Sequence, residues 1–437
     1  MLKDSKHSLN IKTFGCKVNT YDTGLLESRF TKAGYLLKDQ SHIHVLNTCA
    51  VTDEATQEAI RTIRKIKTKD PGSVVVVTGC AAQVDTDKFR NISGADLVVA
   101  NSHKGQLEEL ISKHLRGELT EKIFKSNIFK KDDLEEGGGR EEGHTRAFLK
   151  IQDGCNSFCT FCVIPFARGK SRSLTIEAIR TRVKDLLAQG VREIVLTGVH
   201  IGDYEFGLEN LIEDILLNTR VPRLRLTSLE PIEISDRLFD LFIDPRLCPH
   251  FHMSIQSSTT SVLTGMKRKY GSREVESSLN EIAKRVPNAF VGMDVICGFP
   301  GEGEDEFLDT YSRLSNLPWT RIHVFPYSER PGTYAMKLDG QNERTVVSRR
   351  SQRLRELSHK RYLDQALKQI GLKKKVLVLK NGRGLARDYW PVVVEGLSGS
   401  DSHNEEILVE ITGIYSGSPG RAELPLTGRI SDIHSNL

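Results

Sequence analysis

Residues 147–162 read AFLKIQDGCNSFCTFC. The first six residues form a strand candidate, and the following ten carry three cysteines on a loop. Cys155, Cys159 and Cys162 are separated by three and then by two residues. Three thiolates this close can hold three irons of a four-iron four-sulfur cube and leave the fourth iron open to an outside ligand. A structural zinc site is the weaker interpretation, because zinc usually takes four protein ligands and no fourth cysteine or histidine lies within a few residues.

This strand candidate opens a series in which strands and helices alternate about six times. Thr175 can cap the first helix, and Gly190 can end it. Six such units predict an α/β fold, a partial or open (β/α)6 barrel, over residues 144–340. By analogy with complete barrels, we expect its active site at the C-terminal ends of the strands. The predicted strands are residues 147–152, 193–197, 224–227, 250–255, 290–296 and 321–325.

The first 130 residues repeat one pattern three times, a strand candidate that ends just before a cysteine. Helical stretches separate the repeats, and Thr52 with Asp53 can cap one of these helices. Alternation of strand and helix predicts a parallel sheet in this N-terminal domain. Because all strands of a parallel sheet end at one edge, the three cysteines are expected to meet in one crevice. The strand candidates are residues 9–14, 43–48 and 73–78, and the cysteines are Cys16, Cys49 and Cys80.

Residues 131–143 are polar and predict a linker between this domain and the barrel. Gly137-Gly138-Gly139 lies there in a run of acidic residues. A phosphate-binding loop is disfavoured, because no strand precedes the glycines, no Lys-Ser or Lys-Thr follows them, and the acidic flanks would repel phosphate.

A basic helix is predicted after the barrel, over residues 341–371. The segment 343–375 holds eleven basic and three acidic residues, a local net charge of +8. Such a stretch fits a polyanion, although a solvated helix face explains it equally well.

Short strands divided by glycine, serine and aspartate turns fill the last segment, residues 372–437. They predict a small antiparallel barrel of a kind that often contacts nucleic acid, and a purely structural cap is the alternative. The predicted strands are residues 375–379, 390–395, 406–411 and 422–426.

The composition of the 437 residues is that of a globular protein, with 38% hydrophobic and 27% charged residues. Its longest purely aliphatic run, Val74 to Val77, is far too short for a membrane span. The N-terminus lacks the apolar stretch of a secretory signal, and eight cysteines are too few for a disulfide scaffold. We therefore expect a cytoplasmic protein whose clustered thiols bind metal or do chemistry.

The cysteine loop resembles the signature of the radical S-adenosylmethionine (radical SAM) superfamily, with an aromatic residue, Phe161, just before the last cysteine. The resemblance implies that the three loop cysteines ligate a four-iron four-sulfur cluster and that S-adenosylmethionine chelates the open iron. An electron from the cluster then cleaves the sulfonium to a 5'-deoxyadenosyl radical. Phe161 is placed near the adenine, unless it is an ordinary core residue, and Gly198 near the methionine group. The string DVICGFPGE at residues 294–302 is similar to the family's later strand beside the cofactor.

Nearly the whole chain is similar to the methylthiotransferases within that superfamily. The resemblance implies that Cys16, Cys49 and Cys80 hold a second four-iron four-sulfur cluster, where the sulfur to be transferred is attached, and that residues 372–437 are a TRAM barrel. The matching strings are GCKVN at residues 15–19, NTCAVT at 47–52, GCAAQ at 79–83 and PFARG at 165–169.

Local strings are most similar to the branch that adds a methylthio group to C2 of N6-threonylcarbamoyladenosine at position 37 of tRNA. They are KVN at residues 17–19, KIQDGCN at 150–156, TGVH at 197–200 and HVFPYS at 323–328. The implied partners are a tRNA anticodon stem-loop and an external electron donor such as flavodoxin or ferredoxin, and the expected state is a monomer. Alternatives are the same chemistry on isopentenyladenosine in tRNA or on an aspartate of a ribosomal protein, and a non-catalytic iron–sulfur RNA-binding protein.

One string departs from the family pattern: Gln256-Ser257-Ser258-Thr259-Thr260 stands where Gln-Ser-Gly-Ser-Asp is usual. Gln256 and Ser257 are therefore retained only as possible cofactor contacts. Arg168 is a candidate for binding a substrate carboxylate or phosphate, and a structural salt bridge is the alternative. Cys248 and Cys297 match no ligand position and are expected to be free thiols. His200 and His323 stand at strand ends and are either substrate contacts or structural histidines, and the structural alternative applies to His252 as well.

Overall fold

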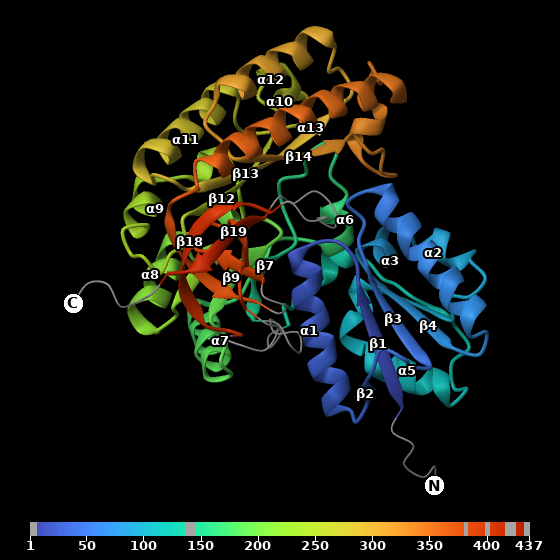
Figure 1. Cartoon of the computed structure of the whole chain (residues 1–437). Helices are drawn as coiled ribbons and strands as arrows, with labels where there is room; N and C mark the ends of the chain where they lie inside the picture. The colour runs from blue at the N-terminus through green and yellow to red at the C-terminus, as the bar shows by residue number, and fades with distance from the viewer. Residues whose placement is uncertain (1–6, 136–144, 380–382, 398–402, 416–424, 432–437) are drawn as a thin grey trace.

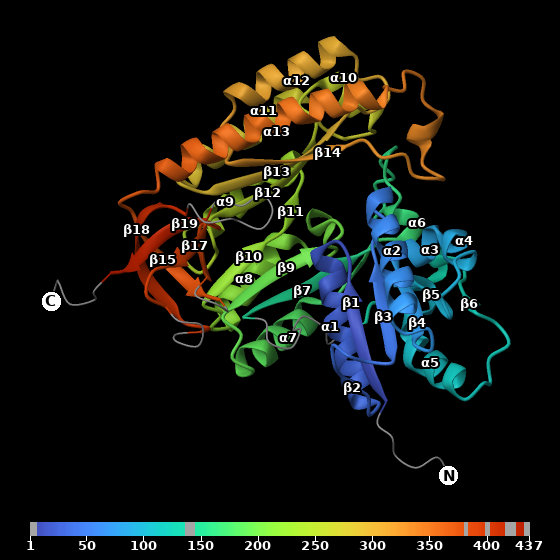
Figure 2. The ribbon, with the colours of Figure 1, turned by 45° about the vertical axis from the view of Figure 1, so that its right-hand side comes forward.

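The computed structural model describes residues 7–135, 145–379, 383–397, 403–415 and 425–431. It contains an N-terminal α/β sheet, a central open barrel and a small C-terminal barrel, with one long helix, α13, running along the central barrel (Figures 1 and 2). None of the described helices is long and apolar enough to cross a bilayer.

The N-terminal sheet is fully parallel, as the sequence predicts, with strand order β2-β1-β3-β4-β5-β6. Alternate side chains of each strand pack on opposite faces: Val75 and Val77 lie against α2, whereas Val76 lies against α1 and α5. The strands are β1 (Ser8–Thr13), β2 (Leu36–Leu37), β3 (Ile43–Thr48), β4 (Val74–Gly79), β5 (Leu97–Ala100) and β6 (Ile123–Phe124). The helices are α1 (Lys17–Lys32), α2 (Asp53–Lys69), α3 (Cys80–Val84), α4 (Thr86–Arg90) and α5 (Leu107–Leu115).

The predicted cap of α2 is confirmed. The Thr52 hydroxyl accepts a hydrogen bond from the backbone N–H of Ala55 at 3.3 Å, and Asp53 stands in the first turn, where the helix dipole favours an acid. Ile60 and Ile63 are buried on its inner face.

The central unit is the predicted open barrel of six parallel strands, but its third strand is broken at Thr227. The part before the break, β10, pairs with β9, whereas the part after it, β11, pairs with β12. The strands are β7 (Arg146–Asp153), β8 (Arg172–Ser173), β9 (Glu193–Gly198), β10 (Arg223–Leu226), β11 (Ser228–Leu229), β12 (His250–Gln256), β13 (Phe290–Cys297) and β14 (Arg321–Pro326), with β8 a short antiparallel addition. The helices are α6 (Ile164–Arg168), α7 (Ile176–Ala188), α8 (Leu208–Asn218), α9 (Asp236–Leu241), α10 (Thr260–Gly265), α11 (Ser272–Arg285) and α12 (Glu304–Asn316).

The predicted basic helix is α13 (Arg344–Leu367), and the predicted C-terminal barrel follows it as a closed ring of strands in the order β15-β16-β17-β19-β18. One pair, β17 with β19, is parallel, which corrects the purely antiparallel expectation. Five strands closed into a ring cannot alternate in direction at every pair, so one parallel pair is unavoidable. The strands are β15 (Lys373–Val378), β16 (Arg383–Ala386), β17 (Pro391–Val394), β18 (Glu406–Ile414) and β19 (Leu426–Ile430).

Two predicted segments fall partly outside the described residues. Of the predicted linker, residues 136–143 lie outside, and Glu135, the last described residue before them, is bound by Arg29 of α1 at 2.8 Å. Of the predicted strand 422–426, residues 422–424 lie outside, and β19 begins at Leu426. The boundaries between domains stay a prediction.

A buried charge cluster joins the C-terminal barrel to the central one. Glu193 of β9 is fully buried and binds Arg146, Arg223 and Arg225 at 2.6, 2.8 and 3.0 Å. Arg223 also binds Glu406 of β18 at 2.7 Å, and Arg225 donates to the backbone carbonyl of Arg387 at 3.0 Å. These guanidinium groups span the boundary between the two barrels.

Glu193→Gln should therefore destabilise the protein by about 3–5 kcal/mol, because it leaves buried guanidinium groups without their carboxylate. The measurement is the urea midpoint at neutral pH under anaerobic conditions. Glu54→Gln is the matched control, since Glu54 pairs with Arg61 at the surface and should shift the midpoint little. Equal shifts of the urea midpoint in the two variants would contradict the role of Glu193 in joining the two barrels.

Candidate active site

A cavity of about 560 Å³ lies between the three units of the chain. The N-terminal domain contributes the residues at the C-terminal edge of its sheet, the central barrel contributes strand residues, and the C-terminal barrel contributes Tyr389. From the first domain these are Gly15, Cys16, Lys17, Val18, Cys49, Val51 and Cys80. From the central barrel they include Gly198, His250, His252, Asp294, Arg321 and His323.

The three N-terminal cysteines meet at this cavity, as the strand pattern predicts. Cys16 precedes α1 and Cys80 begins α3, so both stand at helix N-termini, where the backbone dipole favours a thiolate. Gly15 permits the close approach of Cys49: it has a φ of +90°, and a Cβ at Gly15 would lie 2.5 Å from the Cys49 Sγ. Any other residue at this position would push the cysteines apart.

The thiols of Cys16, Cys49 and Cys80 at this edge suit an iron–sulfur cluster, whose core is cationic. Burial, followed by the neighbouring thiols of Cys16 and Cys80, raises the pKa of Cys49 to about 12. Burial also raises the pKa of Cys80, although Arg168 opposes the shift. Thiols that ionise so reluctantly alone are stabilised as thiolates by bound iron. The residues therefore fit an iron–sulfur cluster, and their ligation stays a prediction.

The second cysteine group lies on the loop after β7. The loop folds back because Gly154 has a φ of +74°, and a Cβ there would lie 1.9 Å from the carbonyl oxygen of Lys170. The backbone N–H of Cys155 donates to the carbonyl of Gly169 at 3.1 Å. Burial and the charges of Cys159 and Cys155 raise the pKa of Cys162 to about 12. This loop too presents a compact set of thiols that fits a cluster.

His200 is a partner of the loop rather than an isolated histidine. Although burial opposes it, hydrogen bonds with Cys155 and Glu233 raise the pKa of His200 to about 11. Burial raises the pKa of Cys155, but hydrogen bonds from His200 and Ser157 together outweigh it and the net shift is downward. The His200 ring itself lies 3.5 Å from the Ser157 hydroxyl and 2.5 Å from the Glu233 carboxylate.

The other predicted cofactor contacts are placed differently from one another. Gly198 ends β9 and lines the cavity, whereas Phe161 packs on a small apolar cluster with Met266 and Phe299. Gln256 ends β12 in a left-handed conformation, with a φ of +62°. Ser257 is fully buried, and its hydroxyl lies 3.2 Å from that of Thr310 in α12, so it faces away from the cavity.

The residues that depart from the family string form hydrogen bonds to a neighbouring helix. Thr259 donates its hydroxyl hydrogen to Asp309 of α12 at 2.7 Å, and Ser258 donates to the backbone carbonyl of Thr310 at 3.3 Å. These hydroxyl groups attach the turn after β12 to the neighbouring helix.

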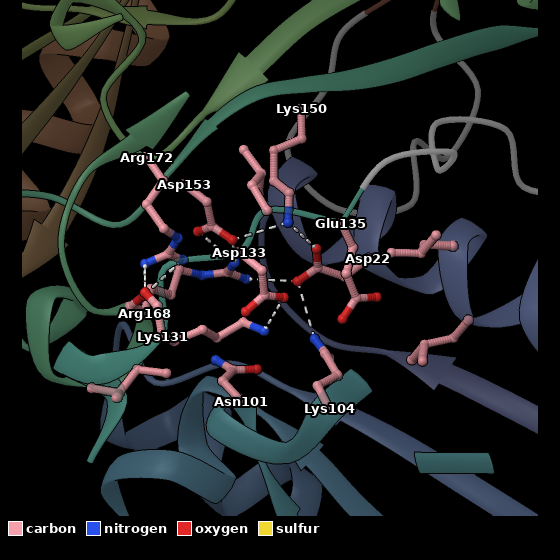
Figure 3. A pocket seen from close by; sticks show the side chains of 14 residues that line it. Asp22, Asn101, Lys104, Lys131, Asp133, Glu135, Lys150, Asp153, Arg168 and Arg172 are labelled. Carbon is pink, nitrogen blue, oxygen red and sulfur yellow. Dashed lines mark hydrogen bonds and ion pairs between the residues drawn. The ribbon is translucent and has the colours of Figure 1, made fainter. Parts of the chain in front are cut away.

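Arg168 lies in a buried network of charges between α1, β7 and α6 (Figure 3). Its guanidinium binds Asp153 at 2.9 Å and Asp22 at 3.1 Å. Lys150 binds the same two carboxylates at 3.0 and 2.6 Å, and Lys104 binds Asp22 at 3.0 Å. Both terminal nitrogens of Arg168 are thus committed to the protein, which favours the structural interpretation over direct substrate binding.

Sequence reasoning missed three residues of the site. Tyr389 comes from a turn of the C-terminal barrel, where no sequence pattern links it to the cysteines, and its ring lies 4.0 Å from that of His250. Lys17 belongs to the string GCKVN, but no role was predicted for it. Arg268 forms an ion pair with Glu230 and lies over the ring of Phe161 at 5.6 Å, and the run Lys267 to Lys269 was its only signal.

Two parts of the chain match known protein families. Residues 8–100 match the family model described as uncharacterized protein family UPF0004, and residues 149–314 match that of the radical SAM superfamily. The threonylcarbamoyladenosine tRNA methylthiotransferase MtaB of Aquifex aeolicus is 35% identical over 395 residues, which cover 88% of this chain and 96% of the relative. MtaB of Bacillus subtilis is 36% identical over 362 residues, 79% of each chain.

The chain belongs to the MtaB family of radical SAM methylthiotransferases.

Two further likenesses lie outside the MtaB group. A tRNA-2-methylthio-N(6)-dimethylallyladenosine synthase of Corynebacterium jeikeium is 31% identical over 398 residues, covering 85% of this chain and 76% of the relative. The solved structure of TsrM, a radical SAM methyltransferase of Kitasatospora setae, has a TM-score of 0.58 and 13% identity over 76% of this chain and 74% of its own. The second likeness shows a shared fold alone. As a radical SAM enzyme, this MtaB-family chain uses S-adenosylmethionine and a four-iron four-sulfur cluster.

Asp22→Asn in this MtaB-family chain should lower the free energy of unfolding at pH 7 by about 3–5 kcal/mol, since three buried cations lose one carboxylate. Burial alone would raise the pKa of Asp22, but Lys104, Lys150 and Arg168 hold it well below the ordinary value of 3.8. A carboxyl whose folded pKa is depressed stabilises fully above its unfolded pKa and loses this effect as the pH falls through the folded pKa. The difference between wild type and variant should therefore shrink below pH 3.8.

Urea unfolding at pH 7 and in acid measures both effects. Asp39→Asn is the control, because Asp39 is exposed on the same domain. A difference between wild type and Asp22→Asn that stays constant into strong acid would rule out the carboxylate as its source.

Proposed function

We propose that this chain transfers a methylthio group to C2 of N6-threonylcarbamoyladenosine at position 37 of tRNA. The observation that carries the proposal is the single cavity that Cys16, Cys49 and Cys80 share with the strand residues of the radical SAM barrel. A base bound there would lie beside the N-terminal cysteines and beside Gly198 of the radical SAM barrel. The MtaB relatives, named for this nucleoside, support the choice of substrate.

The proposal includes two clusters, one on Cys155, Cys159 and Cys162 and one on Cys16, Cys49 and Cys80. When bound, the first cluster with S-adenosylmethionine supplies the radical that activates the C2–H bond, and the second holds the sulfur. The protein's part is to hold the flipped-out base against Cys16, Cys49 and Cys80 in the cavity, while Cys159 and Cys162 line a separate groove. Gly198 lines the cavity on the barrel side, and Tyr389 and His250 line it toward the C-terminal barrel.

RNA binding is assigned to the face that carries α13 and the C-terminal barrel. Five of the eleven basic residues predicted as a footprint serve the protein itself: Arg349, Arg350 and Arg353 pair with Glu304, Arg361 donates to the backbone carbonyls of Ser315 and Leu317, and Lys374 pairs with Asp388. The other six are exposed, namely Arg344, Arg355, Lys360, Lys368, Lys373 and Lys375. Such side chains suit the phosphates of an anticodon stem-loop, which give affinity without sequence information.

An external one-electron donor of the flavodoxin or ferredoxin type completes the proposal. A groove of about 600 Å³ is lined by Cys159 and Cys162 and by Phe158 and Phe166, which are each 40% exposed. A donor approaching on this side would reach the loop cysteines without entering the substrate cavity. We place the enzyme in the cytoplasm as a monomer.

Expression in a host without its own tRNA methylthiotransferases should produce 2-methylthio-N6-threonylcarbamoyladenosine, detected by mass spectrometry of digested tRNA. Cys155→Ala is the matched negative control. The isopentenyl product instead would keep the chemistry and change the substrate, consistent with the 31% identical synthase. Unchanged tRNA from a host that contains the intact protein would contradict the proposal, and a methylthiolated ribosomal protein would identify the rival substrate.

Cys16→Ala should abolish methylthiolation while leaving reductive formation of 5'-deoxyadenosine. Iron content should fall from about eight to about four per chain, because one of two four-iron clusters loses a ligand. Cys248→Ala is the control, since Cys248 is buried between β10 and β12 and should change neither quantity. Methylthiolated product from Cys16→Ala would remove Cys16 from the sulfur site.

A further inference from the structure

Lys17 presents to the cavity an amine that forms no ion pair with a described carboxylate. It is the first residue of α1, follows Cys16 directly and lines the cavity wall in a half-buried position. Within the described part of the chain, no carboxylate lies within 4 Å of its ammonium group, unlike the half-buried Lys104 and the buried Lys150, which both bind Asp22. A lysine placed in this way is ready to bind an anion.

The surroundings make the cavity cationic as a whole. Asp294 is the one acidic residue among its described lining, and His252 binds it at 3.0 Å. Arg321 lines the same cavity, with its guanidinium 5.3 Å from the ring centre of Tyr362. Arg168 reaches the cavity too, but Asp22 and Asp153 neutralise it. Among the lining residues next to the N-terminal cysteines, Lys17 is therefore the cation that pairs with no described carboxylate.

We propose that Lys17 binds the carboxylate of the threonylcarbamoyl group and thereby selects this nucleoside over those with an uncharged N6 group. The inference rests on the proposed function and specifies how its substrate is recognised. Lys17 adjoins Cys16. A carboxylate bound to Lys17 would therefore hold the N6 substituent beside the cysteines that must lie near C2 of the adenine. An isopentenyl group offers the ammonium no partner, so it leaves a half-buried charge unpaired and is disfavoured.

The test compares two anticodon stem-loops that differ in one charge. One carries N6-threonylcarbamoyladenosine, and the other carries its carboxamide analogue, in which the threonyl carboxylate is neutral. Wild-type holoenzyme, assayed anaerobically, should favour the carboxylate about 10- to 100-fold in kcat/KM, the range of a charge-assisted hydrogen bond. Fluorescence anisotropy of labelled stem-loops should give the same preference in binding, independently of turnover.

Lys17→Met should reduce the preference to near one by lowering affinity for the carboxylate stem-loop alone. Lys17→Arg should retain most of it, because the charge stays. Lys17→Gln repeats the neutral case in the event that methionine disturbs Cys16, and iron content is measured for every variant. Lys32→Gln is the matched control: Lys32 is exposed at the other end of α1 and should behave as the wild type.

Two outcomes separate the inference from the function on which it rests. If wild type methylthiolates the carboxylate stem-loop and both neutral variants keep the full preference, Lys17 is not the carboxylate anchor. An equal loss on both stem-loops also overturns the inference, because it indicates a phosphate contact or a structural role. If wild type instead neither binds nor modifies the threonylcarbamoyl stem-loop while its clusters are intact, the proposed function itself fails.

Discussion

The buried ion pairs of Arg168 with Asp22 and Asp153 are the constraint on which the site depends. Asp22 lies in α1, which begins next to Cys16, whereas Asp153 ends the strand that leads into Cys155. Separate charges at such depth would be costly, so each side of the contact needs the other. The same interactions that join two domains therefore also set the relative positions of the two cysteine groups.

A second buried cluster fixes the third wall of the cavity. Glu193 gathers arginines from β7 and β10, and one of them, Arg223, continues to Glu406 in the C-terminal barrel. Through this contact the barrel presents Tyr389 to the cavity. The C-terminal barrel is thus more than a cap, because it forms part of the wall of the cavity that is proposed to hold the base.

Local sequence patterns predicted what short-range physics determines. The strand 43–48 matches β3 residue for residue, because an apolar run between turn signals and a following cysteine define it. The strands β2 and β6 were missed because each has only two residues, too few to show a periodicity. The break at Thr227 was missed because it arises from pairing of the two halves of the strand with different neighbours. The convergence of Cys16, Cys49 and Cys80 could be predicted from the parallel topology of the sheet. The position of Tyr389 at the cavity could not, because it depends on a contact between domains that no local pattern encodes.

Helix α1 has one more property that bears on how such chains can be recombined. Its Tyr21 is 1% exposed and packs within the core of the central barrel, together with Ala147 and Leu149 of β7. The helix is thus a shared wall, covalently part of one domain and sterically part of the next. A chimera joined within the linker would leave the barrel with a foreign helix in its core. The transferable unit is the barrel together with the helix that packs into it.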